Sequence, residues 1–228
     1  MPQGRLLIAI DGPAGAGKSA TARELAVRLG VPYLDTGAMY RAVALLARRS
    51  GLGPSLDAAG RLAVVALART LCVAFNGDPR AQRVLLDGTD VTRELRASEI
   101  SRMASVVSAI PEVRREMVQR QRELAARSGG VVEGRDIGTV VFPEADLKVF
   151  LTAEPEVRAR RRFDELARHG LAARWEDVLE EQRERDRRDS TRPDSPLRPA
   201  EGAVIVDTSR LTLPEVVEAV AALLPVRP

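Results

Sequence analysis

The chain has 228 residues, of which 45% are hydrophobic and 29% are charged, a balance that excludes a disordered or membrane-embedded protein. This length allows one substantial α/β domain with a smaller insert and a sizeable buried core. The 35 cationic residues include only two lysines, Lys18 and Lys148, and 32 acids leave a net charge of +3. The pI near 9.6 therefore reflects the high pKa of arginine and does not by itself indicate nucleic-acid binding.

Composition excludes several kinds of chemistry. One cysteine, Cys72, and one histidine, His169, allow neither an intrachain disulfide nor a zinc site of the usual Cys/His count. We expect His169 at a helix end, which does not favour a Ser-His-Asp hydrolase, and Cys72 in the core of a strand. Four Phe, two Tyr and one Trp are too few for the base-stacking platforms of single-strand binders. Charges interrupt every apolar run well before 18 residues, so we expect a cytoplasmic protein without membrane contact.

Predicted strands and helices alternate along the chain. The apolar run 5–10 indicates a strand buried on both faces, and a glycine-rich segment then opens a helix that ends at Gly30. Later elements have the same character: strands at 33–35, 131–133, 147–151 and 203–206, and helices at 38–49, 111–127, 155–168, 175–190 and 214–224. This alternation predicts an α/β protein with a parallel sheet and helices on both faces.

Two segments depart from this pattern. Segment 62–91 contains a predicted β-hairpin, with strands at 71–76 and 83–87, and we expect it to form an inserted antiparallel subdomain. Segment 154–192 holds eleven acids and eleven arginines, which indicates a pair of solvated helices. Glutamate and arginine one turn apart should form ion pairs there, at Glu154/Arg158 and Glu181/Arg185.

A phosphate-binding motif follows the first strand. Gly12-x-x-x-x-Gly17-Lys18-Ser19 is a full P-loop between a predicted strand and a predicted helix. Glycines let the loop turn its N–H groups towards a polyphosphate, and the helix N-terminus adds partial positive charge. Lys18 would reach the β- and γ-phosphates, and Ser19 would offer its hydroxyl to Mg²⁺. The sequence therefore predicts binding of ATP and Mg²⁺ by Gly12, Pro13, Ala14, Gly15, Ala16, Gly17, Lys18, Ser19 and Ala20.

A P-loop alone permits several activities. A GTPase needs an Asn-Lys-x-Asp clamp, but the only asparagine, Asn76, has no lysine beside it, and large motor ATPases need a longer chain. A small-molecule kinase remains, and it needs a second anion site for the acceptor. Candidate side chains follow the ends of predicted strands or share one helical face: Arg41, Arg135 and Asp136 at strand ends, and Arg185, Asp189 and Arg192 at i, i+4 and i+7.

These residues lie in segments that closely resemble the bacterial cytidylate (CMP) kinase family. The matching segments are 12–19, 34–41, 111–114, 133–143 and 184–189, and the resemblance spans essentially the whole chain, including the insert. The most specific of them is Gly-Arg-Asp-Ile-Gly-Thr-Val-Val-Phe-Pro, residues 134–143. The resemblance implies a P-loop kinase fold with a five-stranded parallel sheet, a small antiparallel insert and a helical lid. It also implies a core of residues 1–35, 106–153 and 190–228, a monophosphate-binding region at 36–105, and the lid with its following helix at 154–189.

The family resemblance further implies transfer of the γ-phosphoryl group from ATP to CMP or dCMP, directly and in line, with Mg²⁺. Carried over by position, the residues facing cytosine are Thr36, Ser105, Arg114 and Asp136. The sugar would be bound by Arg185 and Asp189, and the acceptor phosphate by Arg41, Arg135 and Arg192, with Tyr40 nearby. Catalysis would rest on Lys18 and on the lid arginines Arg158, Arg161 and Arg162. The expected partner is the CMP or dCMP substrate, with no nucleic acid, and the expected state is a monomer.

The chain departs from the family pattern at three positions: Thr36 stands where serine is usual, Glu133 where aspartate is common, and Ala20 leaves Ser19 as the only hydroxyl for Mg²⁺. Two alternatives stay open. The first is a kinase for UMP, AMP or a shikimate-like acceptor. The second, suggested by the pI, is an arginine-rich NTPase that binds RNA or the ribosome.

Overall fold

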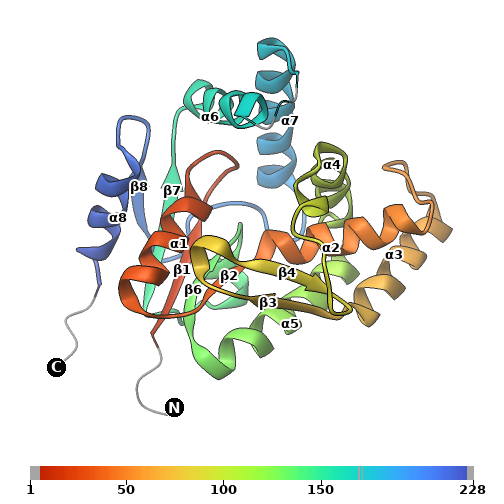
Figure 1. The fold of residues 1–228 in the computed structure, drawn as a ribbon, viewed down its shortest axis with the longest axis horizontal. Helices are drawn as coiled ribbons and strands as arrows, with labels where there is room; N and C mark the ends of the chain where they lie inside the picture. Colours follow the sequence, from red (N-terminus) through yellow and green to blue (C-terminus); the bar gives the residue numbers. More distant parts are fainter. Residues whose placement is uncertain (1–5, 169, 171, 225–228) are drawn as a thin grey trace. The chain divides into compact units, whose positions relative to one another are not determined.

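The chain divides into two compact units in a computed structural model that describes residues 6–168, 170 and 172–224 (Figure 1). The first unit comprises Met1–Tyr33 and Gly129–Pro228, and the second comprises Leu34–Ser128. His169 lies outside the described residues, so its expected place at a helix end stays a prediction. The division into core, monophosphate-binding region and lid also stays a prediction.

The predicted parallel sheet of five strands is confirmed, and its strands have the order β2-β6-β1-β7-β8. Its strands are β1 (Leu7–Asp11), β2 (Tyr33–Asp35), β6 (Gly130–Glu133), β7 (Leu147–Thr152) and β8 (Val204–Asp207). Strand β1 is central, with Ile8 beside Val131 on one side and Leu147 on the other. Strand β1 has a strand on either side and both of its faces are covered. Its residues 7–10 are therefore all apolar. The carboxyl end of β1 leads directly into the P-loop.

Four helices complete the first unit: α1 (Lys18–Leu29), α6 (Pro155–Arg168), α7 (Trp175–Thr191) and α8 (Leu213–Ala221). Leu25 of α1 and Val216 of α8 join the sheet in one buried apolar cluster. Helices α6 and α7 pack against each other, where the rings of Phe163 and Trp175 meet edge to face at 6.1 Å. Pro155 occupies the first position of α6, where its missing N–H has no helical partner to lose.

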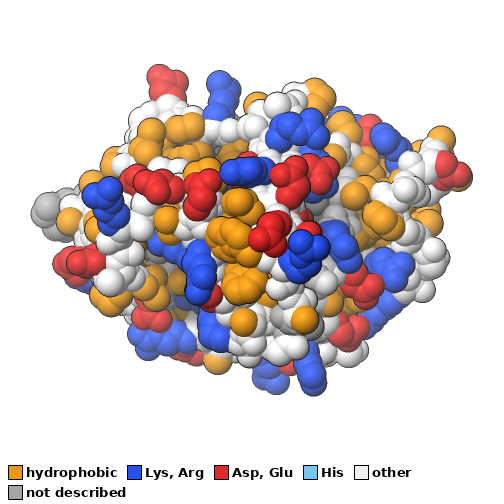
Figure 2. All heavy atoms as spheres, turned by 90° about the horizontal axis from the view of Figure 1, so that it is seen from above, with side chains coloured by type: hydrophobic (Ala, Val, Ile, Leu, Met, Phe, Trp, Pro, Cys, Tyr) orange, Lys and Arg blue, Asp and Glu red, His pale blue; other side chains and the backbone are white. Residues whose placement is uncertain are grey.

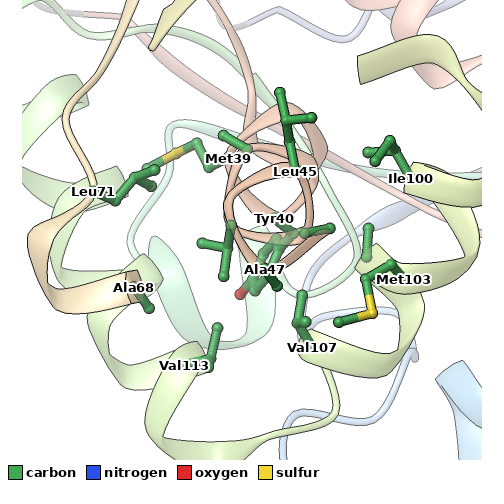
Figure 3. Close-up of a cluster of buried hydrophobic side chains, with 14 of the residues drawn as sticks. Met39, Tyr40, Leu45, Ala47, Ala68, Leu71, Ile100, Met103, Val107 and Val113 are labelled. Atoms are coloured by element: carbon green, nitrogen blue, oxygen red, sulfur yellow. The ribbon is translucent and has the colours of Figure 1, made fainter. Parts of the chain in front are cut away.

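The second unit is mainly helical and has its own core (Figure 3). Its helices are α2 (Thr36–Arg49), α3 (Ala58–Thr70), α4 (Ser98–Val107) and α5 (Pro111–Ser128). Figure 3 shows Met39 and Leu45 of α2 among side chains of the surrounding helices, including Val107 and Val113. An antiparallel sheet with the order β3-β4-β5 completes it: β3 (Val73–Asn76), β4 (Arg83–Leu86) and β5 (Thr89–Asp90). The predicted antiparallel insert is therefore confirmed.

Two expectations for this region were wrong. Residues 62–70 belong to helix α3 and not to the insert, because Asp57 caps the helix by accepting the Gly60 N–H at 2.7 Å and Val64 and Ala68 are buried one turn apart. Cys72 is exposed, not in a strand core. Burial alternates here, so that Leu71 faces inward and Cys72 outward.

Several arginines on the described surface pair with acids. Exposed ion pairs include Arg48 with Glu99 at 3.3 Å and Arg49 with Glu94 at 2.9 Å. Figure 2 shows basic and acidic side chains interspersed over one face of the molecule. Such exposed pairs each contribute about 0–1 kcal/mol, so they affect solubility more than stability. None of the helices among the described residues has the length and apolar character needed to cross a membrane.

Candidate active site

The P-loop connects β1 to α1 through backbone that only glycine tolerates. Gly12 has φ +144°, and a Cβ there would lie 2.0 Å from the carbonyl oxygen of Leu151. Gly15 has φ +76°, and a Cβ there would lie 2.9 Å from the carbonyl oxygen of Arg158. Helix α1 begins after Gly17 with no side-chain cap, which leaves its first N–H groups available to an anion. The loop therefore has the backbone of a phosphate site.

Side chains of α6 and α7 hold the carbonyl groups of this loop. Arg158 Nη1 and Gln182 Nε2 both donate to the carbonyl oxygen of Ala14, at 3.3 and 2.9 Å. Arg161 Nη1 donates to the carbonyl oxygen of Gly15 at 3.2 Å. The two ends of a trans peptide point in opposite directions, so anchoring Ala14 O aims the Gly15 N–H away from these helices.

Lys18 is buried beside the loop, and its Nζ donates to the carbonyl oxygen of Pro13 at 2.8 Å. Burial, helped by the nearby charge of Arg135 and opposed by that of Glu133, lowers the pKa of Lys18 to about 7. These surroundings therefore stabilise the charged ammonium poorly. Phosphate oxygens at this position would favour its charged form.

Sequence reasoning missed Asp11, the last residue of β1. Its carboxylate accepts the N–H groups of Ile137 and Gly138 at 2.8 and 2.7 Å. These two residues begin a five-residue π-helical turn, Ile137–Val141, directly after Asp136. Burial raises the pKa of Asp11 to about 6, although both backbone hydrogen bonds oppose the rise. A carboxylate at the end of an almost wholly buried strand needs such partners, and this was the signal that the sequence offered.

Ser19 is the candidate magnesium ligand, and its environment fits that role. The side chain is partly buried in the first turn of α1, and no described residue hydrogen-bonds its hydroxyl. Within residues 6–168, 170 and 172–224, no group of three or more His, Cys, Asp or Glu side chains could hold a metal by itself. A metal here would therefore depend on Ser19 together with oxygen atoms from phosphate and water.

In the first unit, the structure brings together several residues predicted to bind the acceptor. Arg135 follows β6 and donates from Nε to Asp189 of α7 at 3.0 Å. Burial raises the pKa of Asp189, but the charges of Arg135, Arg185 and Arg192 outweigh it and hold the pKa below its usual value. Arg192 ends α7 and donates from Nε to the carbonyl oxygen of Ser195 at 2.6 Å. The i, i+4, i+7 spacing thus places three charged residues in one electrostatic group.

In the second unit, the candidates gather at the start of α2. Asp35 caps this helix by accepting the Ala38 N–H at 2.9 Å, and its other oxygen accepts Arg41 Nη2 at 2.7 Å. The guanidinium of Arg41 is thereby held close to the helix N-terminus, where both groups favour an anion. Thr36, the first residue of α2, is buried.

Arg114 and Ser105 are the remaining candidates of the second unit. Arg114 lies on α5, is 3% exposed, and donates from Nη1 to the carbonyl oxygen of Ser108 at 3.2 Å. Its guanidinium carbon lies 5.6 Å from the ring centre of Tyr40, a cation–π arrangement. Ser105 is partly buried on α4.

The three predicted lid arginines of α6 have different surroundings. Arg158 is 5% exposed and pairs with Asp186 at 2.6 Å, so the expected pair with Glu154 is wrong. Arg161 donates to Thr208 through both Nη atoms, at 3.0 and 2.7 Å, and burial lowers its pKa. Arg162 pairs with Glu165 on its own helix at 2.8 Å. Arg158 and Arg161 therefore contact the P-loop, whereas Arg162 does not.

Comparison with known proteins decides the family. The family model described as Cytidylate kinase matches residues 8–225. The chain belongs to the cytidylate kinase family. A relative from Corynebacterium efficiens, named cytidylate kinase, is 52% identical over 95% of this chain and 93% of its own length. Cytidylate kinases of Caldanaerobacter subterraneus and Mycobacterium avium are 51% and 49% identical, over 93% of this chain and 92% of their own lengths.

A solved structure agrees at the level of the fold. The structure of an uncharacterized protein from Eubacterium ventriosum matches with a TM-score of 0.51 over 98% of this chain and all of that chain. The two sequences are 10% identical, so this likeness concerns the fold alone.

Glu133, which stands where aspartate is common in the cytidylate kinase family, is a buried and hydrogen-bonded residue. Glu133 is the last residue of β6 and is 3% exposed. Its Oε1 accepts the hydroxyl of Tyr33, a buried residue of the same sheet. The carboxylate also lies close enough to Lys18 to favour the charged ammonium. Glu133 thus contributes to the electrostatics of the P-loop lysine.

Proposed function

We propose that this chain transfers the γ-phosphoryl group of ATP to CMP or dCMP, giving ADP and CDP or dCDP. The observation that carries the proposal is the match of nearly the whole chain to the cytidylate kinase family. The P-loop, with Lys18 against it, supplies the donor-phosphate chemistry that this reaction needs.

The donor phosphates are assigned to residues 12–20. Backbone N–H groups of the loop and the N-terminus of α1 bind the phosphate oxygens, and Lys18 places a positive charge between them. Ser19 would hold Mg²⁺, which supplies positive charge on the phosphates when it is bound. These residues thereby orient the γ-phosphoryl group for transfer.

The acceptor is assigned by hydrogen-bonding chemistry. Cytosine offers an amino donor, suited to Asp136 or Ser105, and acceptors at N3 and O2, suited to Arg114. Thr36 adds a hydroxyl to this group. We assign the sugar to Arg185 and Asp189, and the phosphate to Arg41, Arg135 and Arg192 together with Tyr40. Buried polar groups of this kind discriminate against bases that leave them unpaired.

Transfer is proposed to be direct and in line, because the chemistry requires positioning and charge stabilisation rather than a covalent intermediate. Arg158, Arg161 and Arg162 are proposed to act as lid residues that exclude water and stabilise charge on the moving phosphoryl group. In other enzymes a catalytic arginine contributes on the order of 10³-fold or more to such a reaction. We further propose that the enzyme is a cytoplasmic monomer and that it does not bind nucleic acid.

The direct test is product analysis. Incubation with ATP, Mg²⁺ and CMP, followed by anion-exchange chromatography, should give CDP and ADP in equal amounts. The Lys18→Met variant should form both products at a greatly reduced rate. Release of ADP without formation of CDP, at a rate indifferent to CMP, would show an ATPase instead.

A further inference from the structure

We propose that Asp186 of α7 is a positioning residue for the P-loop, acting through Arg158. This inference rests on the proposed kinase function and extends it to a residue outside the predicted set. Asp186 lies on the helix that also carries Arg185 and Asp189. Its carboxylate, however, accepts hydrogen bonds from Arg158 of α6 and from Gln182, the two side chains that donate to the loop carbonyl of Ala14.

Asp186, Arg158, Gln182 and the carbonyl group of Ala14 form one hydrogen-bonded network within the first unit. Asp186 Oδ2 accepts Arg158 Nη1 at 2.6 Å, and Oδ1 accepts Gln182 Nε2 at 3.4 Å. Arg158 Nη1 and Gln182 Nε2 then both donate to the carbonyl oxygen of Ala14. Gln182 and Asp186 are one helical turn apart, so both side chains lie on one face of α7, from which Gln182 contacts the loop. Two donors and one carboxylate thereby fix one carbonyl group.

Burial makes this carboxylate necessary. The Arg158 side chain is 6% exposed and that of Asp186 is 24% exposed. A guanidinium removed from water to this extent requires a counter-charge and acceptors for its N–H groups. Its Nε donates to the carbonyl oxygen of Ala153 at 2.8 Å, which fixes the stem of the side chain. Asp186 therefore determines where the other end of the guanidinium lies.

The geometry links Asp186 to ATP through the Ala14–Gly15 peptide. Holding Ala14 O towards α6 and α7 aims the Gly15 N–H in the opposite direction, as a phosphate-binding amide requires. The backbone of Arg158 also packs on Gly15 so closely that a Cβ would not fit. Among the described residues, no acceptor contacts Nη2 of Arg158, so this group is available to a ligand oxygen. Loss of Asp186 should therefore weaken the donor site and leave the acceptor site unchanged.

The test is a double-mutant cycle with Asp186→Asn, Arg158→Met and the combined variant, assayed for kcat and for KM of both substrates. We expect Asp186→Asn to raise KM for ATP about tenfold, the size expected for a lost charge-assisted hydrogen bond, with KM for CMP within about twofold. In the Arg158→Met background, the same substitution should change kcat/KM for ATP less than about twofold. An equal effect in both backgrounds, or an effect confined to CMP, overturns the proposal.

Two further variants keep the result interpretable. Asp164→Asn makes the same chemical change in an exposed ion pair, with Arg160 at 3.0 Å on α6, and should leave both KM values unchanged. Gln182→Met removes the other hydrogen-bond donor to the carbonyl oxygen of Ala14. This variant replaces Asp186→Asn as the test if Asp186→Asn does not fold. It should also raise KM for ATP, by a smaller factor, and no rise would overturn the proposal. Failure of the wild-type protein to make CDP would instead refute the proposed function.

Discussion

Lys18 lies in surroundings that disfavour its positive charge. Burial lowers its pKa to about 7, whereas phosphate oxygens would raise it again. Binding of MgATP above pH 7 should therefore take up a proton. We expect about one proton per ATP at pH 8 and little uptake at pH 6. Titration calorimetry in two buffers of different ionisation enthalpy measures this number, and a binding enthalpy independent of the buffer at pH 8 would contradict the expectation.

Asp11 gives a second pH-dependent prediction. Burial raises its pKa in the folded chain to about 6, above the ordinary value of 3.8. The folded state therefore binds the proton more tightly than the unfolded state, and this contribution to stability is lost as the pH rises through 6. Asp11→Asn cannot titrate and also loses an acceptor for Ile137 or Gly138.

We accordingly expect Asp11→Asn to lower the free energy of unfolding by about 1–3 kcal/mol, the usual cost of leaving a buried donor unsatisfied. The deficit relative to the wild type should be larger at pH 5 than at pH 7. Urea unfolding at the two pH values measures it. A deficit of equal size at both would mean that Asp11 does not titrate in this range.

Arg41 depends on Asp35 in a comparable way. The aspartate accepts the Ala38 N–H and the Arg41 guanidinium with different oxygens. Asp35→Asn can keep the cap but not the charge, so it should release Arg41 while costing little stability. We expect KM for CMP to rise severalfold, with KM for ATP unchanged, in steady-state assays. A rise in KM for ATP alone would show that Arg41 serves the donor.

Residue positions could be predicted where the signal is local. Lys18 and Ser19 follow from the P-loop spacing, and Arg41 and Arg135 from the ends of strands. The partners of Asp11 and Gln182 could not be predicted in this way, because they lie 126 and 168 residues away in sequence. The ion-pair partner of Arg158 was predicted wrongly for the same reason. The sequence suggested Glu154, which is four residues away, but the structure pairs Arg158 with Asp186.

At the scale of the element, the strand-turn-helix unit around the P-loop depends on close backbone contact. Gly15→Ala would require a side chain at φ +76° and 2.9 Å from the carbonyl oxygen of Arg158. We expect at least tenfold weaker ATP binding and a lower melting temperature, measured by titration and by thermal unfolding.

Gly53→Ala is the matched control for this substitution. No atom lies within 4 Å of a Cβ at Gly53, and its φ is not in the left-handed region. This variant should resemble the wild type in both measurements. If Gly15→Ala also resembled the wild type, the tight packing of α6 on the loop would be contradicted.

Strands and helices could be predicted where the sequence has a clear pattern of apolar residues or a residue typical of an element's first turn. Other elements could not be predicted. Strands β1 and β6 appear in the sequence as short apolar runs because they are buried on both faces. Helices α5 and α6 begin at prolines, Pro111 and Pro155, that fit a first helical turn. The π-helical turn Ile137–Val141 has no such signal, because hydrogen bonds from its first N–H groups to Asp11 fix it from a distant strand.

At the scale of the whole molecule, the arginine excess does not produce a uniformly basic surface. Acidic and basic side chains alternate on the face drawn in Figure 2, and the net charge is +3. We therefore expect no salt-sensitive mobility shift with RNA at 50 mM salt. A tight complex that weakens steeply as salt rises would instead indicate many phosphate contacts and a nucleic-acid partner.

The central claim concerns the acceptor, and it is tested most directly by kcat/KM for CMP, dCMP, UMP and AMP at saturating MgATP. Hydrogen-bonding groups at Asp136 and Arg114 suit the amino group and ring acceptors of cytosine, and a site of this kind rejects bases that leave them unpaired. The account predicts that CMP and dCMP are the preferred acceptors, ahead of UMP and AMP. Equal or better turnover of UMP or AMP would contradict it.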